Sequence, residues 1–334
     1  MWQQLMEVIN HHQRFILSTH LLPDGDGLGS ETALYHFLRS LGKDVLIVNN
    51  DPLPLKYDFL DPHGVMVTFR GQSTLRDLLD FEVLIVLDNS FKHRLGQAAA
   101  LVDLANVICV SIDHHAFHGE LGSIRILDQK ASSIGEMVYN LIIAMGGKIT
   151  KAMAVGLYTS LVTDTHHFSS ESTTERTFEL ARELVQCGVN PGDIHDAIYE
   201  RNNLSQTRLL GDMLRTTGKE LNGRLAYGYI DYDMFQKAAV GPEDTDYFPD
   251  FLSSLEGVDI AVLFKEIEPQ VISVSLRSKG KINVGLIASD FGGGGHNDMA
   301  GMLLTCQLDV GIEQVLDAFR RAIERGTEPE TSFS

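Results

Sequence analysis

The chain has 334 residues, of which 44% are hydrophobic, and a formal net charge of −18. This length exceeds what one hydrophobic core usually serves, so we expect two domains. An acidic surface repels long nucleic acids, because their binding depends on Lys and Arg that neutralise phosphates. The composition therefore disfavours a partner of long nucleic acids, but it is compatible with a short anion held in a locally positive, metal-charged pocket.

Cysteine usage and hydropathy exclude further classes. The three cysteines, Cys109, Cys187 and Cys306, are widely spaced and form no CxxC pair, so neither a disulfide framework nor a thiolate zinc site is expected. The N-terminus has no basic segment followed by an apolar core, and no apolar run reaches the roughly 18–20 residues needed to cross a bilayer. A soluble cytoplasmic protein with no membrane partner is the expectation.

Strand-like apolar runs alternate with helical patterns in the first part of the chain. The expected strands are residues 14–19, 44–49, 82–88 and 106–113. The first expected helix opens at Gly29 and Ser30, with one face formed by Leu34, Phe37, Leu38 and Leu41, and later helices cover 132–145, 152–163 and 172–187. This alternation predicts an α/β domain, residues 1–190, with a mostly parallel sheet and helices on both faces.

The rest of the chain has a different pattern of expected strands and helices. Residues 191–220 are expected to link the domains through a connecting helix, over about 194–216. The second domain, residues 221–334, is predicted to be a smaller α/β domain. Its expected strands are 225–230, 260–266 and 271–278, and its expected helices lie near 248–255 and 312–325.

Acidic and histidine side chains follow the apolar runs where these runs end. The fourth run ends in Asp113, His114 and His115, and the others end near His20, Asp24, Asp26, Asp88 and Asp164. Ligands bind outside the carboxyl ends of parallel strands, so these residues are expected to converge. Taken singly, an Asp-Gly-Asp can be a turn, a His-His pair a surface feature, and Asp88 the cap of a turn. Their joint placement at the ends of apolar runs favours a metal site.

Six of these residues form an oxygen-rich set with two imidazoles. They are His20, Asp24, Asp26, Asp88, His114 and Asp164. Four carboxylates at one sheet edge need a counter-charge, and Mn²⁺ or Mg²⁺ suits such ligands. Six ligands exceed the needs of one catalytic ion, but two ions roughly 3.5–4 Å apart that share a carboxylate would use them all. A hydroxide held by both ions would attack phosphorus in line, which predicts phosphoester hydrolysis.

The motifs that contain these residues resemble those of the DHH phosphoesterases, and within them the DHH/DHHA1 group and its nanoRNase and pAp phosphatase (oligoribonuclease-like) branch. They are His20-x-x-Pro-Asp-Gly-Asp-x-x-Gly-Ser30, Val86-Leu-Asp88, Asp113-His-His115, Thr163-Asp-Thr165, Ser275-Leu-Arg-Ser278 and Gly292-Gly-Gly-Gly-His296 followed by Ala300-Gly301, in family order over residues 14–302. The resemblance implies one Mn²⁺ on His20, Asp24 and Asp88, and a second on Asp26, Asp88, His114 and Asp164. His115 would contact the scissile phosphate or assist proton transfer, and Asp113 would orient the histidines.

The second domain resembles the substrate-binding DHHA1 module. The residues that the resemblance assigns to the substrate are Arg277, Ser278, Gly293, Gly294, Gly295 and His296. Arg277 would clamp a phosphate, and the glycines would let backbone N–H groups approach a phosphate or a base. A glycine run can also be a flexible linker, but the ordered patterns on both sides favour a binding loop. Arg94 is either a phosphate contact or a solvated surface residue.

One motif departs from the family pattern. After Thr163-Asp-Thr165 the nanoRNase pattern usually continues with Gly-Arg-Phe or Gly-Ser-Phe, whereas this chain has His166-His167-Phe168. Two imidazoles beside an expected metal ligand should change the pocket wall. Our hypothesis is that His166 or His167 narrows the substrate range by stacking on a base or by hydrogen bonding to it.

The resemblance implies a Mn²⁺-dependent phosphodiesterase that cleaves very short RNA into mononucleotides, with the dinucleotide pGpG from cyclic di-GMP turnover as a plausible substrate. Mg²⁺ could replace Mn²⁺. A pAp 3′-phosphatase and a cyclic dinucleotide phosphodiesterase would use the same ions, so both remain alternatives. A non-catalytic nucleotide-binding sensor is the alternative from another class. The branch also implies a homodimer formed through the first domain.

Overall fold

The computed structural model describes residues 1–104, 107–115, 118–201, 203–280 and 282–326. Asn106, the expected first residue of the fourth strand, and the last expected residues, 327–334, lie outside this described part. The chain divides into two compact units, Met1–Arg201 and Asn202–Ser334. Each unit has a six-stranded sheet and its own hydrophobic clusters, so the expected two-domain α/β fold is confirmed.

The sheet of the first unit is parallel throughout. Its strands are β1 (Arg14–Ser18), β2 (Asp44–Asn49), β3 (Met66–Thr68), β4 (Val83–Leu87), β5 (Ile108–Asp113) and β6 (Ile124–Leu127). They are ordered β3-β2-β1-β4-β5-β6, and every pairing between neighbours is parallel. Leu84 and Val86 of β4 belong to one hydrophobic cluster, and Ile85 belongs to another. Both faces are thus buried, which explains the continuous apolar runs.

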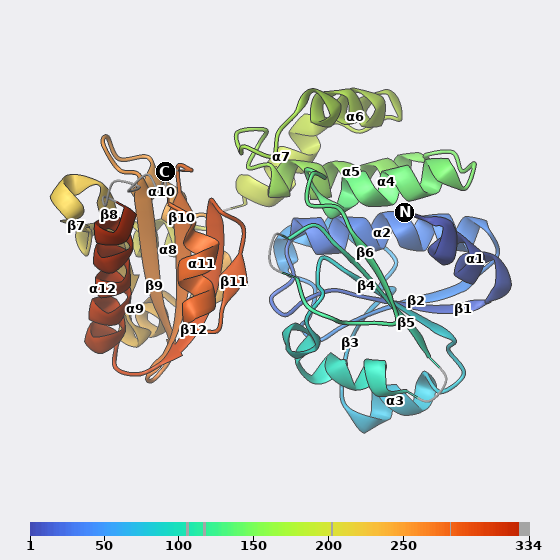
Figure 1. Ribbon diagram of the computed structural model, residues 1–334, viewed down its shortest axis with the longest axis horizontal. Coiled ribbons are helices and arrows are strands. Elements are labelled where there is room, and N and C mark those ends of the chain that lie inside the picture. Colours follow the sequence, from blue (N-terminus) through green and yellow to red (C-terminus); the bar gives the residue numbers. More distant parts are fainter. Residues whose placement is uncertain (105–106, 116–117, 202, 281, 327–334) are drawn as a thin grey trace, which may run out of the picture. The chain divides into compact units, whose positions relative to one another are not determined.

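Helices cover both faces of this sheet (Figure 1). The helices of this unit are α1 (Gln3–His11), α2 (Gly25–Ser40), α3 (Gln72–Asp77), α4 (Ile134–Ala144), α5 (Lys151–Asp164), α6 (Glu175–Gln186) and α7 (Pro191–Tyr199), with 3₁₀ segments η1 (Leu55–Leu60) and η2 (Lys92–Asp103). The cluster on one face includes buried residues of α2, α4 and α5, and the cluster on the other includes residues of η2. No described helix combines the length and apolar character that a bilayer crossing requires.

The strand order reverses between β1 and β4, which are neighbours in the sheet although β2 and β3 lie between them in sequence. Open α/β sheets bind ligands at the carboxyl ends of the strands beside such a reversal. His20 follows β1 after one intervening residue, Asp88 follows β4 directly, and Asp113 ends β5. The fold therefore places the expected residues where this architecture forms a site.

The second unit has a mixed sheet ordered β11-β12-β10-β9-β8-β7, in which β8 and β9 are parallel and the other pairs are antiparallel. Its strands are β7 (Gly218–Glu220), β8 (Leu225–Ile230), β9 (Ile260–Glu268), β10 (Val271–Ser278), β11 (Gly294–Gly295) and β12 (Met299–Thr305). Its helical segments are α8 (Leu204–Arg215), η3 (Leu221–Gly223), α9 (Tyr232–Ala238), η4 (Pro242–Thr245), α10 (Phe248–Ser253), α11 (Val284–Asp290) and α12 (Leu308–Gly326). Residues of α11 and α12 fill one cluster, and residues of α8, α9 and α10 fill the other.

The expected beginning of the first long helix is wrong by four residues, because α2 begins at Gly25 and not at Gly29. Gly25 and Gly27 suggest a turn, but both lie inside the helix. An added Cβ at Gly27 would lie 2.3 Å from Thr19 Oγ1, so this glycine allows the helix to approach β1 closely. Leu41, expected on the buried face, is 44% exposed just after the helix end.

The single connecting helix expected over residues 194–216 is also wrong. This stretch forms α7 and α8, and the division between the two units falls between them, at Arg201 and Asn202. Asn203 caps α8, because its side chain accepts a hydrogen bond from the Gln206 N–H, and the Gln206 side chain in turn accepts one from the Asn203 N–H. This reciprocal cap starts a new helix in a stretch whose polar pattern suggested a continuous one.

Candidate active site

Asp88 is the carboxylate around which the acidic and histidine residues of the first unit gather. It is buried and has a left-handed backbone, with a φ of 58°, which for a residue other than glycine often marks a functional site. His20 Nε2 lies 3.1 Å from its Oδ2. Its Oδ1 lies 3.6 Å from His114 Nε2 and 3.5 Å from His115 Nδ1. One carboxylate thus has imidazole neighbours at both oxygens.

Backbone carbonyls fix the ring orientations of His20 and His114. His20 Nδ1 lies 2.7 Å from the Leu21 carbonyl oxygen, and His114 Nδ1 lies 3.1 Å from the Ala131 carbonyl oxygen. Because a carbonyl only accepts, both Nδ1 atoms donate, and in the neutral ring the lone pair is then on Nε2. Both Nε2 atoms face carboxylates, as the ring nitrogen of a metal-binding histidine would.

The first turn of α2 supplies two carboxylates. Asp24 caps the helix by accepting hydrogen bonds from the N–H groups of Asp26, at 3.0 Å, and Gly27, at 3.3 Å. Asp26 is buried and accepts from the Ile134 N–H, at 3.0 Å, at the start of α4. Its Oδ2 lies 3.4 Å from His114 Nε2. The positive ends of two helix dipoles therefore favour anionic groups here.

Asp113 holds the two histidines that follow it. Its Oδ1 accepts hydrogen bonds from the His114 N–H at 2.9 Å, the His115 N–H at 3.2 Å and the His115 ring Nδ1 at 2.7 Å. Ser90 donates to its Oδ2. Burial opposes the charged form, but the hydrogen bond and charge of His115 outweigh burial and hold the pKa of Asp113 at about 2. Asp113 is therefore ionised, and it orients the His115 ring through Nδ1.

Asp164 completes the group from the end of α5, where its Oδ2 lies 3.7 Å from His114 Nε2. Among the described residues of the first unit, three sets have ligand atoms within 4.8 Å of one another. They are His20, Asp24 and Asp88; Asp26, Asp88 and His114; and Asp88, Asp113 and His115. Asp88 belongs to all three sets. The first set has the residues that the family resemblance implied for one ion, and the second has three of the four implied for the other, without Asp164.

The charges at this cluster indicate a need for cations. Burial and the charges of Asp164 and Asp88 raise the pKa of Asp26 well above its usual value. Burial also raises the pKa of Asp164, to about 7. The Oδ1 of Asp88 is buried and accepts no hydrogen bond from the described residues. Buried carboxylates in mutual repulsion are stabilised by a divalent ion, and carboxylate oxygens with imidazoles are the donors that Mn²⁺ or Mg²⁺ accepts.

Arg94 lies beside this cluster. Its carbonyl oxygen accepts a hydrogen bond from the Leu21 N–H at 2.6 Å, and its side chain is partly buried. Burial and the charge of Arg94 lower the pKa of His20, although Asp88 and Asp24 raise it by more. Of the two alternatives for Arg94, this placement is compatible with a phosphate contact.

His166 and His167 form the turn that ends α5. The His167 N–H donates to the Val162 carbonyl at 2.9 Å, and His166 has a φ of 46°, as in a Schellman cap. Glycine is usual at the position of His166 because left-handed backbone is costly for other residues. His167 and Phe168 continue with φ values of 57° and 63°. The departure from the family pattern is therefore a sterically unfavourable turn directly after Asp164.

In the second unit, Arg277 and Ser278 end β10. Arg277 Nε lies 3.3 Å from Asp250 Oδ1. The Ser278 N–H donates to the Asp298 carbonyl at 2.7 Å, whereas its Oγ is buried and has no hydrogen-bond partner among the described residues. A buried hydroxyl without a protein partner next to an arginine is a suitable donor for a ligand.

The glycine run of this unit is ordered structure and not a linker. Gly294 and Gly295 form β11 and pair with β12. An added Cβ at Gly293 would lie 2.3 Å from the Gly301 carbonyl oxygen, so the close approach requires glycine. The His296 N–H donates to the Met299 carbonyl at 2.6 Å, which closes the turn between the two strands.

Several supporting residues were not identified from the sequence. Ser160 donates to Asp26, and its hydroxyl accepts a hydrogen bond from the Gly135 N–H at 2.7 Å. Asn49, at the end of β2 and beside the strand that leads to His20, accepts a hydrogen bond from the Thr19 N–H at 2.9 Å and donates one to Glu31 at 2.8 Å. Asn49 and Asp113 end their strands and Asp88 directly follows its own, so the same rule could have found Asn49. Ser160, inside an apolar helix, carried no such signal.

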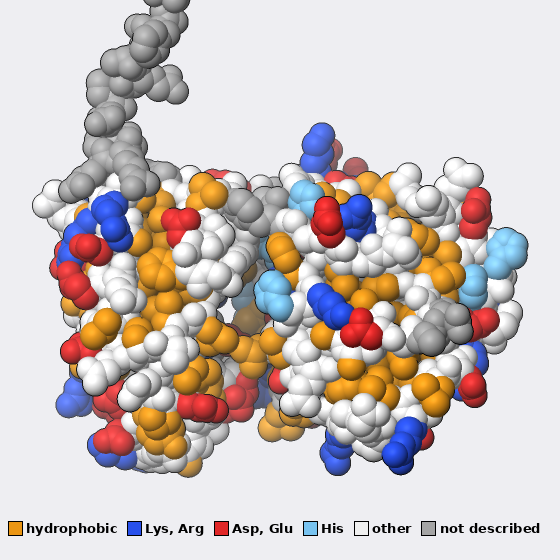
Figure 2. Space-filling view, turned by 60° about the horizontal axis from the view of Figure 1, so that its bottom comes forward, with side chains coloured by type: hydrophobic (Ala, Val, Ile, Leu, Met, Phe, Trp, Pro, Cys, Tyr) orange, Lys and Arg blue, Asp and Glu red, His pale blue; other side chains and the backbone are white. Residues whose placement is uncertain are grey.

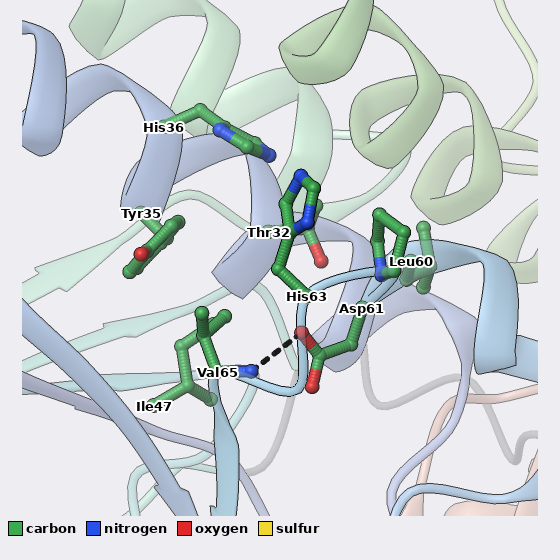
Figure 3. A pocket seen from close by; sticks show the side chains of 9 residues that line it. Thr32, Tyr35, His36, Ile47, Leu60, Asp61, His63 and Val65 are labelled. Atoms are coloured by element: carbon green, nitrogen blue, oxygen red, sulfur yellow. Dashed lines mark hydrogen bonds between the residues drawn. The ribbon is translucent and has the colours of Figure 1, made fainter.

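A separate hollow lies between α2 and the stretch from η1 to β3 (Figure 3). His36 and His63 line it, and Asp61 accepts a hydrogen bond from the Val65 N–H at 2.7 Å. Its volume of about 20 Å³ has room for about one water molecule. It is too small for a nucleotide and contains none of the residues described above.

Comparison with known proteins gives consistent matches over nearly the whole chain. The N-terminal domain of the DHH family matches residues 14–161, and the DHHA1 domain matches residues 222–325. The bifunctional oligoribonuclease and PAP phosphatase NrnA of Thermus thermophilus is 30% identical, over 92% of this chain and 90% of that protein. NrnA of Bacillus subtilis is 27% identical, over 88% and 90%. The crystal structure of an exopolyphosphatase-related protein from Bacteroides fragilis has a TM-score of 0.85 and 26% identity, covering 97% of this chain and 95% of that one.

Proposed function

The chain belongs to the DHH family of phosphoesterases and carries a DHHA1 domain, and from this premise we propose that it hydrolyses very short RNA, dinucleotides above all, to mononucleotides. The observation that carries the proposal is the group of carboxylates and imidazoles around Asp88. The T. thermophilus and B. subtilis relatives, named as oligoribonucleases, support short RNA as the substrate class.

The surface charge supports short substrates over long ones. The net charge is −18, and on the face seen in Figure 2 the Lys and Arg side chains are scattered among Asp and Glu. Affinity for a long strand grows with the number of phosphates that Lys and Arg neutralise. A dinucleotide needs only a local cationic site, which bound metal ions and Arg94 would provide.

The proposed mechanism assigns His20, Asp24 and Asp88 to one ion and Asp26, Asp88, His114 and Asp164 to a second. Bound Mn²⁺ or Mg²⁺ would lower the pKa of a water molecule and neutralise charge on the phosphoryl oxygens. Asp113 holds His115 in place so that the other ring nitrogen, Nε2, can contact the scissile phosphate or donate a proton to the leaving oxygen. Arg94 would stabilise a non-bridging phosphate oxygen.

The second unit carries the residues that the family resemblance assigns to substrate binding. Arg277 and the hydroxyl of Ser278 would hold a terminal phosphate. Gly294 would let the substrate approach the backbone, because nothing lies within 4 Å of its added Cβ, whereas Gly293 and Gly295 pack closely against β12. His296 would contact the nucleoside. Asp250 orients Arg277 through the 3.3 Å ion pair and would share it with the phosphate.

The test is a turnover panel with Mn²⁺ or Mg²⁺. It contains 5′-phosphorylated dinucleotides including pGpG, RNAs of increasing length, pAp and a cyclic dinucleotide. We expect the highest kcat/KM on the dinucleotides. Asp88→Ala should abolish every activity. The matched control is Asp80→Ala, because Asp80 is 86% exposed and pairs only with Arg14 among the ion pairs of the described residues.

Two other results would redirect the proposal. The named second activity of the relatives makes pAp the main alternative substrate, and a higher kcat/KM on pAp than on any dinucleotide would select it. Binding of these nucleotides with no turnover of any would instead favour a nucleotide sensor. Activity that survives Asp88→Ala would remove the shared-carboxylate mechanism. The homodimer implied by the family resemblance stays a prediction that sedimentation can test.

A further inference from the structure

Three aromatic side chains meet at the surface of the first unit, and one of them, His167, lies three residues after Asp164. The ring centroids of His167 and Tyr199 are 4.1 Å apart, those of His167 and His195 are 5.6 Å apart, and those of His195 and Tyr199 are 5.4 Å apart. His167 is exposed, the His195 side chain is 47% exposed, and Tyr199 is half-buried. This aromatic cluster therefore presents ring surface to solvent.

The hydrophobic core explains only Tyr199 in this cluster, because Tyr199 is partly buried against the core and the two histidines are not part of it. His195 and Tyr199 are four residues apart on α7, so they lie on one side of the helix. The buried contacts of α7 are made by Ile194 and Ile198, which belong to the main core of the unit. His195 Nε2 lies 3.5 Å from Glu200 Oε1, and this contact orients the ring. His167 and His195 are therefore additional to the packing of the core, and Tyr199 connects them to it.

The third ring is held close to the metal-ligand cluster. Asp164 and His167 are three residues apart, a separation that spans at most about 11 Å even in extended chain. The hydrogen bond from the His167 N–H to the Val162 carbonyl, at 2.9 Å, folds the turn back onto α5 and shortens this separation. His167 adopts a left-handed φ of 57° to do so. Such unfavourable backbone conformations recur at ligand-binding sites.

We propose that His167, His195 and Tyr199 form a stacking surface for a nucleobase of the substrate. This base belongs to one of the two nucleosides that the scissile phosphate joins. This inference rests on the proposed function and deepens it. Unstacked bases of short RNA bind on His and Tyr rings, and such stacking tolerates any base because every base has a π-face. The surface would thus select for the presence of a base and not for its identity.

The experiment compares substrates with and without that base. The substrates are pGpG and two analogues in which an abasic ribose replaces either the 5′ or the 3′ nucleoside. His167→Ala should lower kcat/KM on pGpG by about 5- to 100-fold, mainly through KM, in line with loss of one stacked base. It should change kcat/KM less than about twofold on the analogue that lacks the stacked base. His167→Phe keeps a flat ring and should restore most of the loss, whereas His167→Leu should not.

A binding measurement makes the two possible failures distinguishable. A hydrolysis-resistant phosphorothioate dinucleotide that carries 2-aminopurine should lose fluorescence on binding the wild type and His167→Phe, but not on binding His167→Ala. His11→Ala, an exposed histidine of α1, is the control and should match the wild type in both assays. Turnover of pGpG with equal kcat/KM for wild type and His167→Ala overturns the stacking surface and leaves the proposed function intact. Fluorescence quenching that depends on His167, without turnover of any substrate, supports the stacking surface and overturns the proposed function.

Discussion

His166 occupies a backbone position that favours glycine. Its φ of 46° follows the end of α5, and left-handed backbone costs an L-residue about 1–2 kcal/mol. His166→Gly should therefore raise the free energy of unfolding by about 0.5–1 kcal/mol, after the greater chain entropy of glycine is subtracted. Urea unfolding can be followed through Trp2, the single tryptophan, which packs against the core of the first unit.

The control for this change is glycine at an ordinary helical position. Arg182 is exposed in α6, so Arg182→Gly should lower the free energy of unfolding by about 1 kcal/mol. Equal destabilisation by both substitutions would mean that the His166 turn is not unfavourable.

Glu31 is a buried carboxyl that should make stability depend on pH. Burial raises its pKa from 4.5 to about 8, and Asn49 donates a hydrogen bond to one of its oxygens. Between these values the folded chain holds a proton that the unfolded chain has lost. The stability from this group is therefore complete below about pH 4.5 and falls by about 1.4 kcal/mol per pH unit until about pH 8.

Glu31→Gln removes this titration and keeps an oxygen for Asn49. Between pH 6 and 8, with a chelator present, the wild type should lose about 2 kcal/mol more unfolding free energy than Glu31→Gln. Urea titrations through Trp2 at several pH values measure the difference, in which the other titrating groups cancel. Parallel curves for the two proteins would show that Glu31 is ionised in the folded chain.

At the residue scale, strand ends could be predicted from sequence but their supporting contacts could not. Asp88 and Asp113 follow apolar runs, and the carboxyl ends of parallel strands meet at one edge whatever the rest of the fold does. The partners of Asp26 are different, because its hydrogen bonds come from Ile134 and Ser160, more than 100 residues away. No local pattern encodes such a pairing.

The helices α2 and α5 cross through a pair of glycines. An added Cβ at Gly29 would lie 2.3 Å from the Gly156 carbonyl oxygen, and one at Gly156 would lie 2.4 Å from the Gly29 carbonyl oxygen. Gly156→Ala should therefore cost about 1–3 kcal/mol of unfolding free energy. Because α2 carries Asp26 and α5 carries Asp164, forcing the helices apart should also weaken Mn²⁺ binding, which calorimetric titration measures.

Gly211→Ala in α8 is the matched control for Gly156→Ala, since nothing lies within 4 Å of the added Cβ at Gly211. It should raise the unfolding free energy by up to about 1 kcal/mol through helix propensity, and leave Mn²⁺ affinity unchanged. If Gly156→Ala behaved in the same way, the close crossing would have no role in placing the ligands.

This crossing also shows why element boundaries were only partly predictable. Strands such as β2 and β10 were predicted to the residue because continuous or alternating apolar runs define them. The start of α2 was missed because Gly25 and Gly27, typical of turns, serve close packing there. The short β3 and β6 were missed because strands of three and four residues leave too few positions for a pattern.

At the scale of the whole molecule, the proposed metal ligands all belong to one of two units with separate cores. A ligand that binds only the folded state adds RT ln(1 + [L]/Kd) to stability, about 2.7 kcal/mol at a hundredfold excess over Kd. Mn²⁺ should therefore stabilise the first unit in the full-length chain and leave the second nearly unchanged. The Trp2 unfolding midpoint should rise with Mn²⁺ concentration.

Hydrogen exchange followed by mass spectrometry separates the two units in one experiment. Peptides from β4 and β5 should exchange more slowly when Mn²⁺ is added, because these strands lead to Asp88 and Asp113, whereas peptides from β9 and β10 should not change. Asp88→Asn should remove the effect, since one carboxylate serves all three ligand sets. Equal protection of both sheets would instead mean that Mn²⁺ couples the units, and ligands from the second unit would then have to be sought.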